Sequence, residues 1–167
     1  ELGDHYDPTD KTVRLSKSNF ENRSLTAITV AAHEFGHALQ HAKNYKPLTT
    51  RTSMVRTAQK LERVGGFALL VMPLVAFTPA GARLAPALFL VVILSMLVNP
   101  IVHLVTLPVE FDASFGRALP ILREGQYINN NDYRAARRIL TACALTYLAS
   151  SLSGLLNFWR WLKMLRR

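Results

Sequence analysis

Residues 84–107 read LAPALFLVVILSMLVNPIVHLVTL and contain no acidic or basic residue other than one histidine. About 20 consecutive apolar residues in a helix cross the hydrocarbon core of a bilayer, so this stretch predicts a membrane-spanning helix. The surrounding sequence is also poor in charge, because Arg83 is the only Lys, Arg, Asp or Glu between Val64 and Val109. A soluble domain, in which about a quarter of the residues are charged, would not leave such a stretch bare.

Two further stretches predict membrane spans. Residues 64–80 form a short candidate that contains two prolines, and residues 139–158 form a longer one without any charge. Trp159 and Trp161 follow the longer stretch, where interfacial aromatic residues are common. We therefore expect a mainly α-helical, polytopic membrane protein with about three transmembrane helices.

Polar segments separate these spans within a single domain, residues 1–167. A polar N-terminal part, residues 1–63, precedes a transmembrane hairpin, residues 64–107. A second polar segment, residues 108–138, comes before the third span, and residues 159–167 form a basic tail. Of the 20 Lys and Arg residues, 15 lie in the two polar segments, so the positive-inside rule places these segments in the cytoplasm.

The composition excludes several classes of protein. Half of the 167 residues are hydrophobic and 19% are charged, which is unlike a disordered chain. The net charge of +9 does not predict nucleic-acid binding, because the basic residues flank the apolar stretches, where they face lipid headgroups. The single cysteine, Cys143, excludes both a disulfide within the chain and a cysteine metal site.

Local patterns predict the elements of the N-terminal part. Residues 7–10 (DPTD) indicate a turn between two short strands, at residues 2–6 and 11–15, and hence a β-hairpin.

The spacing of apolar residues predicts a helix over residues 24–42. Ser24 or Asn22 can cap its start, and we expect Asn44 and Pro47 to end it.

Residues 33–37 of this helix read HEFGH, which matches the His-Glu-x-x-His pattern of zinc sites. Residues four apart project from one face of a helix, so His33 and His37 can reach the same zinc ion. Zinc lowers the pKa of a bound water toward about 7, and Glu34 can act as the general base that takes the proton. Two histidines and a glutamate among small apolar neighbours would be costly without such a purpose.

A catalytic zinc site needs a third protein ligand. The sequence after the helix has no His at the spacing of the extended His-x-x-Gly-x-x-His motif, so we expect a carboxylate. Glu110 stands directly after the predicted span 84–107, and a membrane hairpin would return it to the side of the zinc-binding helix. Asp112 is the main rival and Glu124 a more distant one, and two His with a carboxylate favour zinc over cobalt or manganese without excluding them.

The remaining histidines have several interpretations. His5 either approaches the zinc site as a donor to the transition state or bonds Asp7 within the turn. His41 is expected to be a cation at the C-terminal end of the helix, where it suits the helix dipole. His103 lies within the second predicted span, where it either binds a porphyrin or pairs with another helix, or, as we favour, bonds a backbone carbonyl near the interface.

Four motifs follow one another in the chain: DHYDP (4–8), KTVRLS (11–16), AAHEFGHALQ (31–40) and LPVEFDAS (107–114). In these motifs, and in a later ALTY stretch (144–147), the chain resembles the bacterial membrane-bound neutral zinc metallopeptidases of the YugP-like family. The resemblance covers nearly the whole chain. That family normally has an N-terminal transmembrane segment before DHYDP, whereas this chain begins almost at the motif, so we expect a processed or truncated product.

The resemblance implies an integral-membrane gluzincin in the bacterial inner membrane. Its zincin-like catalytic helix and short β-hairpin would lie at the membrane surface, with zinc held by His33, His37 and Glu110 and with Glu34 as the base. The plan is similar to the HtpX and CAAX-prenyl peptidase families, which carry Glu-x-x-Ala-Asp with an Asp that orients a zinc-binding His. Here Ser114 stands at that position, which leaves the orienting role open.

We therefore expect a membrane-embedded zinc-dependent endopeptidase that hydrolyses peptide bonds by a zinc-activated water. Its partners would be protein or peptide substrates near the membrane and the lipid bilayer itself. The alternative is an accessory structural subunit of a larger membrane complex, which keeps the peptidase fold and zinc site with little or no turnover. A row of small residues in the third predicted span suits packing against a helix of such a complex.

Overall fold

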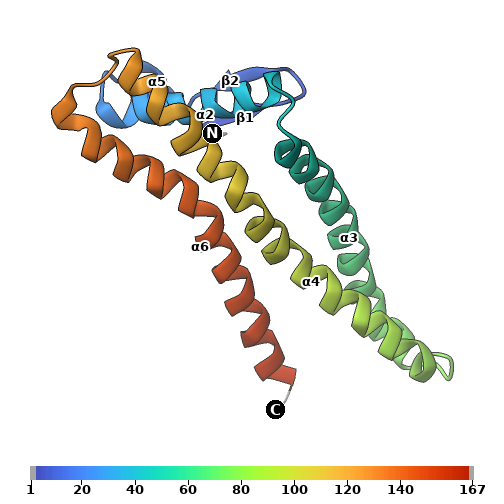
Figure 1. Cartoon of the computed structure of the whole chain (residues 1–167). Coiled ribbons are helices and arrows are strands. Elements are labelled where there is room, and N and C mark those ends of the chain that lie inside the picture. The colour runs from blue at the N-terminus through green and yellow to red at the C-terminus, as the bar shows by residue number, and fades with distance from the viewer. Residues whose placement is uncertain (1–2, 166–167) are drawn as a thin grey trace. The chain divides into compact units, whose positions relative to one another are not determined.

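The computed structural model describes residues 3–165, and most of them are helical (Figure 1). The elements in chain order are β1 (His5–Asp7), β2 (Thr12–Arg14), α1 (Lys17–Glu21), α2 (Leu25–Ala42), α3 (Lys46–Ala76), α4 (Gly81–Phe111), the π-helix η1 (Asp112–Ala118), α5 (Leu119–Glu124), the 3-10 helix η2 (Asn130–Asp132) and α6 (Tyr133–Leu165). They form two compact units. The first comprises Glu1–Thr49 and Thr106–Tyr147, and the second comprises Thr50–Val105 and Leu148–Arg167.

The predicted β-hairpin is confirmed. Strands β1 and β2 pair antiparallel, with Tyr6 opposite Val13, and each is shorter than predicted. In the turn the Asp7 carboxylate accepts hydrogen bonds from the backbone N–H groups of Thr9 and Asp10, which is the Asx-type turn expected of this sequence. Leu2, the first residue of the predicted hairpin, lies outside the described residues.

Helix α2 also confirms its prediction and shows which cap operates. The Ser24 hydroxyl accepts a hydrogen bond from the backbone N–H of Ala27 at 3.1 Å, so Ser24 rather than Asn22 is the N-cap. Asn44, with a φ of 50°, follows the helix end in the left-handed region that Asn tolerates. The prediction that Pro47 helps to end α2 is wrong, because Pro47 lies in the first turn of α3, where its missing N–H costs nothing.

Helix α4 is longer than the predicted span 84–107. It continues through Pro108 to Phe111, and the chain passes without a break into η1 and α5. Glu110 therefore lies on the helix itself rather than in a segment that follows it. The switch to π-helical winding at Asp112 leaves no signal in the spacing of apolar residues, and such π segments often occur at functional sites.

The core of the first unit fixes α2 against η1, α5 and the start of α6. Six buried residues form this core, and partly buried side chains from α2, from η1 and from residues 128 and 133 on either side of η2 pack against it. Burial of this apolar surface is the main force that positions the site described below. The six residues are Ala32, Ala118, Leu119, Leu122, Ala136 and Leu140.

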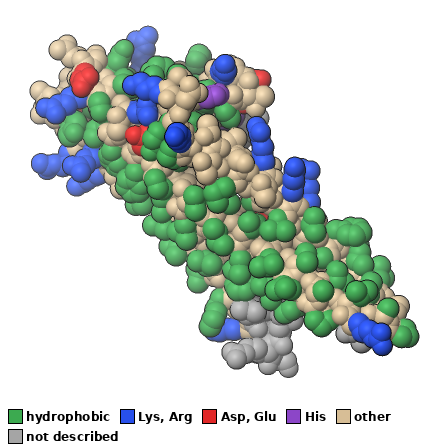
Figure 2. Space-filling model, turned by 45° about the vertical axis from the view of Figure 1, so that its right-hand side comes forward, with side chains coloured by type: hydrophobic (Ala, Val, Ile, Leu, Met, Phe, Trp, Pro, Cys, Tyr) green, Lys and Arg blue, Asp and Glu red, His purple; other side chains and the backbone are tan. Residues whose placement is uncertain are grey.

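Two helical stretches, Arg83–Glu124 and Asn130–Arg160, are long and apolar enough to cross a membrane. They contain two of the predicted spans, 84–107 and 139–158. Only 22% and 18% of their most apolar windows are buried, whereas a core helix of a soluble protein is mostly buried. In the second unit, hydrophobic side chains cover much of the visible face (Figure 2).

The remaining predicted span, 64–80, stays a prediction, as do the total of three crossings and the position of the hairpin at a membrane surface. Residues 64–76 of this span form the end of α3, which starts with charged turns and stops at Ala76, and residues 77–80 follow the helix. The apolar part of that helix is thus shorter than the roughly 20 residues that a crossing needs. Residues 166–167 of the predicted basic tail lie outside the described part of the chain.

Candidate metal centre

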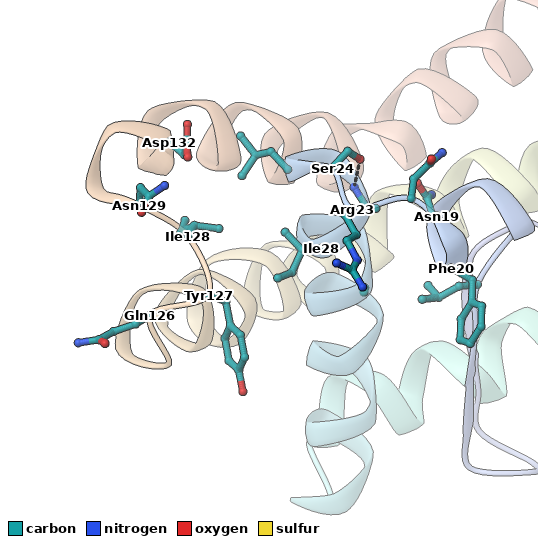
Figure 3. A pocket seen from close by; sticks show the side chains of 15 residues that line it. Asn19, Phe20, Arg23, Ser24, Ile28, Gln126, Tyr127, Ile128, Asn129 and Asp132 are labelled. Carbon is teal, nitrogen blue, oxygen red and sulfur yellow. Dashed lines mark hydrogen bonds between the residues drawn. The ribbon is translucent and has the colours of Figure 1, made fainter.

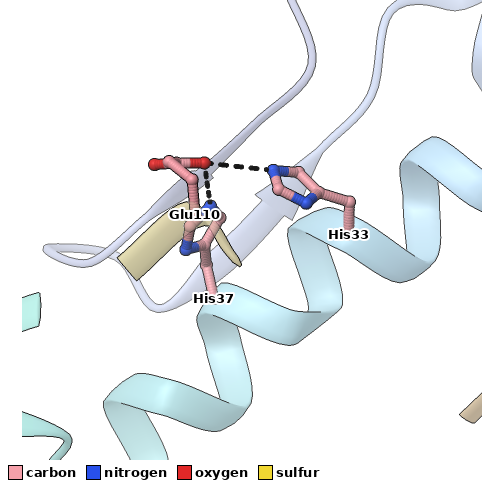
Figure 4. A group of neighbouring side chains, drawn as sticks. All are labelled: His33, His37 and Glu110. Atoms are coloured by element: carbon pink, nitrogen blue, oxygen red, sulfur yellow. Dashed lines mark ion pairs between the residues drawn. The ribbon is translucent and has the colours of Figure 1, made fainter. Parts of the chain in front are cut away.

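Three buried side chains of the first unit converge (Figure 4). The Nε2 atoms of His33 and His37 each lie 3.3 Å from Oε2 of Glu110. One potential ligand atom from each residue lies within 4.8 Å of the other two. The two histidines project from successive turns of α2, and Glu110 comes from α4, so residues far apart in the sequence meet at one point.

Ser114 fixes the orientation of the first histidine. Its Oγ lies 3.0 Å from His33 Nδ1 and donates its single hydrogen to the backbone carbonyl of Leu140 at 3.2 Å. Because a hydroxyl has only one hydrogen to donate, Oγ accepts from Nδ1–H. Nδ1 of His33 therefore carries a hydrogen, and Nε2 is the nitrogen that faces Glu110, so Ser114 orients this histidine.

Gln40 does the same for the second histidine. Its Nε2 donates to the carbonyl of Val109 and to Oδ2 of Asp112, both at 2.8 Å. Its Oε1 therefore faces His37 Nδ1, at 2.9 Å, and accepts the hydrogen bond from that ring. Nδ1 of His37 thus carries a hydrogen, and Nε2 is the nitrogen that faces Glu110.

The donor set fits zinc. It consists of two imidazoles, each oriented through its other nitrogen, and one carboxylate, which are ligands that zinc prefers. Glu110 is 0% exposed, and a carboxylate so deeply buried is costly unless a positive charge compensates it. A bound divalent cation would supply that charge, and three protein ligands leave a coordination position for water.

Glu34 lies beside this centre, on α2 between the two histidines. Its side chain is buried, with 8% of the residue exposed. Burial raises the pKa of Glu34 above its ordinary value, and the nearby Glu110 carboxylate raises it further, against the opposing effect of the two histidines. A carboxyl group whose pKa lies closer to neutrality is better suited to exchange protons at neutral pH.

The structure does not bring the rival carboxylates into the cluster. Asp112 follows Glu110 on the chain, but its Oδ2 accepts from Gln40 and from Arg117 Nε. Glu124 is the last residue of α5 and is exposed. Among the described residues, the metal-ligand cluster contains Glu110 and neither rival.

The other histidines also lie outside the cluster. Nδ1 of His5 donates to the Gly3 carbonyl at 2.7 Å, rather than bonding Asp7, which was one of its two predicted interpretations. His41 is in the last turn of α2, as predicted, and its Nδ1 bonds the Tyr6 hydroxyl at 2.7 Å, which ties strand β1 to the helix. His103 lies on α4 in the second unit, where no described metal cluster includes it.

A pocket of about 650 Å³ opens beside the N-terminal end of α2 (Figure 3). Its wall includes Ser24 and Ile28 from the start of α2, Arg23 just before it, and Tyr127 and Asn129 from the loop after α5. None of the three cluster residues lines it. No pattern in the sequence indicates this pocket, because its two walls are about a hundred residues apart along the chain.

A His-Glu-x-x-His helix completed by a distant glutamate is the arrangement of zinc metallopeptidases. The comparison with known families agrees: residues 1–166 match the family described as "Putative neutral zinc metallopeptidase", and the chain belongs to this family. It is 41% identical over 161 residues to the "Putative membrane protease YugP" of Bacillus subtilis (strain 168), an alignment that covers 95% of this chain and 67% of that protein. No solved structure matches the chain.

Proposed function

We propose that the chain is a membrane-embedded zinc-dependent endopeptidase with His33, His37 and Glu110 as metal ligands and Glu34 as general base. The observation that carries this proposal is the meeting of the two Nε2 atoms at one carboxylate oxygen, each at 3.3 Å. Hydrogen bonds at Nδ1 orient both rings for metal binding: Ser114 bonds His33, and Gln40 bonds His37. The membership in a zinc metallopeptidase family supports the same reaction class.

The chain's own residues would divide the work of hydrolysis as follows. When bound, zinc supplies an acidified water and polarises the carbonyl of the scissile peptide. Glu34 takes a proton from the attacking water and passes it to the leaving nitrogen, for which its raised pKa suits it. The buried position of Glu34 and of the three ligands keeps bulk water from competing for these proton transfers.

We further propose that the substrates are proteins or peptides at the surface of a bacterial inner membrane. Two observations support this: two helices are apolar enough to cross a membrane, and the matched relative is called a membrane protease. Glu110 lies on α4, shortly after the uncharged stretch 84–107 of the same helix. The site would face the cytoplasm, because most Lys and Arg residues lie in the segments that build it.

The test of catalysis is Glu34→Gln, compared with the wild type in detergent or in vesicles. We expect the variant to keep its zinc and to lose about 10²- to 10⁴-fold in peptide hydrolysis, the usual contribution of a general base. Wild-type hydrolysis in the variant would contradict the role of Glu34. Zinc without any hydrolysis in the wild type, together with copurification at fixed stoichiometry in a larger complex, would favour the accessory-subunit alternative.

The test of substrate class uses one peptide sequence in two forms, free in solution and tethered to a lipid anchor. With the enzyme in vesicles, we expect the tethered peptide to be cut faster, because anchoring concentrates it at the bilayer surface. Equal rates for the two forms would contradict the membrane-proximal substrate and leave the zinc chemistry intact.

A further inference from the structure

Gln40 links the two helices that supply the metal ligands. It is 0% exposed and uses both ends of its amide, since Oε1 bonds His37 while Nε2 bonds the Val109 carbonyl and Asp112. Val109 directly precedes Glu110. One side chain therefore holds a ligand from α2 and the backbone next to the ligand from α4.

The Asp112 carboxylate helps to determine which way this amide faces. Its Oδ2 and the Val109 carbonyl both accept from Gln40 Nε2, so the nitrogen end of Gln40 points toward these acceptors and the oxygen end toward His37. Arg117 Nε donates to the same Oδ2 at 2.7 Å and holds that carboxylate in position. The Arg117 guanidinium also lies 5.4 Å from the centre of the Tyr45 ring, a cation–π contact that holds it in place.

The π-helix makes room for this arrangement at Gly116. A Cβ atom at that position would lie 2.7 Å from Asp112 Oδ1, closer than nonbonded atoms tolerate. The absence of a side chain at Gly116 therefore leaves space for the Asp112 carboxylate beside the helix, within reach of both Gln40 and Arg117. A chain of hydrogen bonds thus runs from Arg117 through Asp112 and Gln40 to the buried ring of His37.

We infer that Gln40, Asp112 and Arg117 form a positioning network that fixes the orientation of the His37 ring and its distance to Glu110. The inference deepens the proposed function and rests on the zinc site that this function requires. None of the three residues belongs to the metal-ligand cluster, so they act through His37 and through the backbone beside Glu110. Residues that orient a metal-binding histidine in this way typically change metal affinity by about 10- to 100-fold.

The experiment measures zinc affinity of the full chain in detergent, by competition with a chromophoric chelator. We expect Gln40→Leu to weaken zinc binding by about 10- to 100-fold and Arg117→Ala to weaken it by a smaller factor. Arg123→Ala is the matched control, because Arg123 also lies over a tyrosine ring, that of Tyr133 at 5.7 Å, but stands outside the network. Wild-type affinity in Gln40→Leu, or an equal loss in Arg123→Ala, would overturn the inference.

Two further readouts separate positioning from a general loss of structure. In the double variant of Gln40→Leu and Arg117→Ala, zinc affinity should be no lower than in Gln40→Leu alone, because Arg117 acts only through Gln40. Independent, multiplying losses would overturn the series arrangement. The absorption spectrum of the cobalt-loaded chain should change in Gln40→Leu and not in Arg123→Ala, since it reports the ligand geometry directly.

These measurements do not depend on peptide hydrolysis. If the zinc affinities follow the predicted pattern in a chain that cuts no peptide, the positioning network stands and the peptidase proposal fails. If the chain cuts peptides and Gln40→Leu binds zinc like the wild type, the proposed function stands and the network fails.

Discussion

Gly36 of α2 lies directly against the backbone of Ala113 in η1: a Cβ atom at residue 36 would come within 2.6 Å of the Ala113 carbonyl oxygen. Gly36 lies between His33 and His37 in the sequence, and Ala113 lies three residues after Glu110. The close approach of these two backbones therefore sets the distance between the ligands of α2 and the ligand of α4. Because the obstructing atom belongs to the backbone, a larger residue at position 36 would force the two helices apart.

We predict that Gly36→Ala destabilises the first unit by about 1–3 kcal/mol, the usual cost of overpacking, and also weakens zinc binding. Thermal unfolding and chelator competition measure the two effects. Gly66→Ala in α3 is the control, because a Cβ there meets no atom within 4 Å and alanine favours a helix by about 1 kcal/mol over glycine. Equal behaviour of the two variants would contradict the close-packing account.

A second prediction concerns Ser114, whose hydroxyl bonds His33 Nδ1. Ser114→Ala removes the acceptor that orients the His33 ring, so zinc affinity should fall by about 10-fold or more. Ser95→Ala is the matched control, since Ser95 is also a buried helical serine but bonds the Val92 carbonyl of its own helix. Unchanged zinc affinity in Ser114→Ala would show that His33 binds zinc equally well without the hydrogen bond at its Nδ1.

The third prediction concerns Asp4, which joins the segment before β1 to the start of α1. Its carboxylate accepts hydrogen bonds from the backbone N–H and the hydroxyl of Ser16 and from Asn19 Nδ2. Burial acts to raise the pKa of Asp4, but these hydrogen bonds outweigh it and hold the pKa below the ordinary value of 3.8. The ionised form of Asp4 therefore stabilises the fold at pH values above 3.8. This stabilisation is lost as the pH falls through the lowered pKa.

We expect Asp4→Asn to be less stable than the wild type at neutral pH, with a difference that shrinks as the pH falls below 3.8. The measurement is thermal unfolding across a pH series, with chelator present so that release of zinc does not contribute. A difference that stays constant down to about pH 2 would contradict the lowered pKa, because both chains would then titrate alike.

The sequence predicted those parts of the centre that follow local rules. The spacing of His33 and His37 on one helix, the cap at Ser24 and the turn after Asp7 all depend on residues close together in the chain, and each is found in the structure. Glu110 was predicted from the need for a third ligand, together with its position after an apolar stretch. The structure places it with the two histidines and leaves Asp112 outside the cluster.

The sequence could not predict the residues that hydrogen-bond to the proposed ligands and orient them. Gln40 and Asp112 are 72 residues apart, and their contact depends on the π-helical turn after Phe111, which no spacing of apolar residues indicates. In the sequence, Ser114 is only a departure from a motif. Its bond to His33 depends on the packing of η1 against α2, which the sequence does not reveal. The long-range geometry of the site thus comes from tertiary packing rather than from any local pattern.

The most direct test of the metal centre is the zinc content of the detergent-purified chain, with the wild type measured beside Glu110→Ala and Glu124→Ala. We predict about one zinc per chain in the wild type and in Glu124→Ala, and zinc lost or much more weakly bound in Glu110→Ala, because a catalytic zinc site needs its third protein ligand. A wild-type chain that takes up no zinc, or a Glu110→Ala chain that keeps it as tightly as the wild type, would contradict the three-ligand centre.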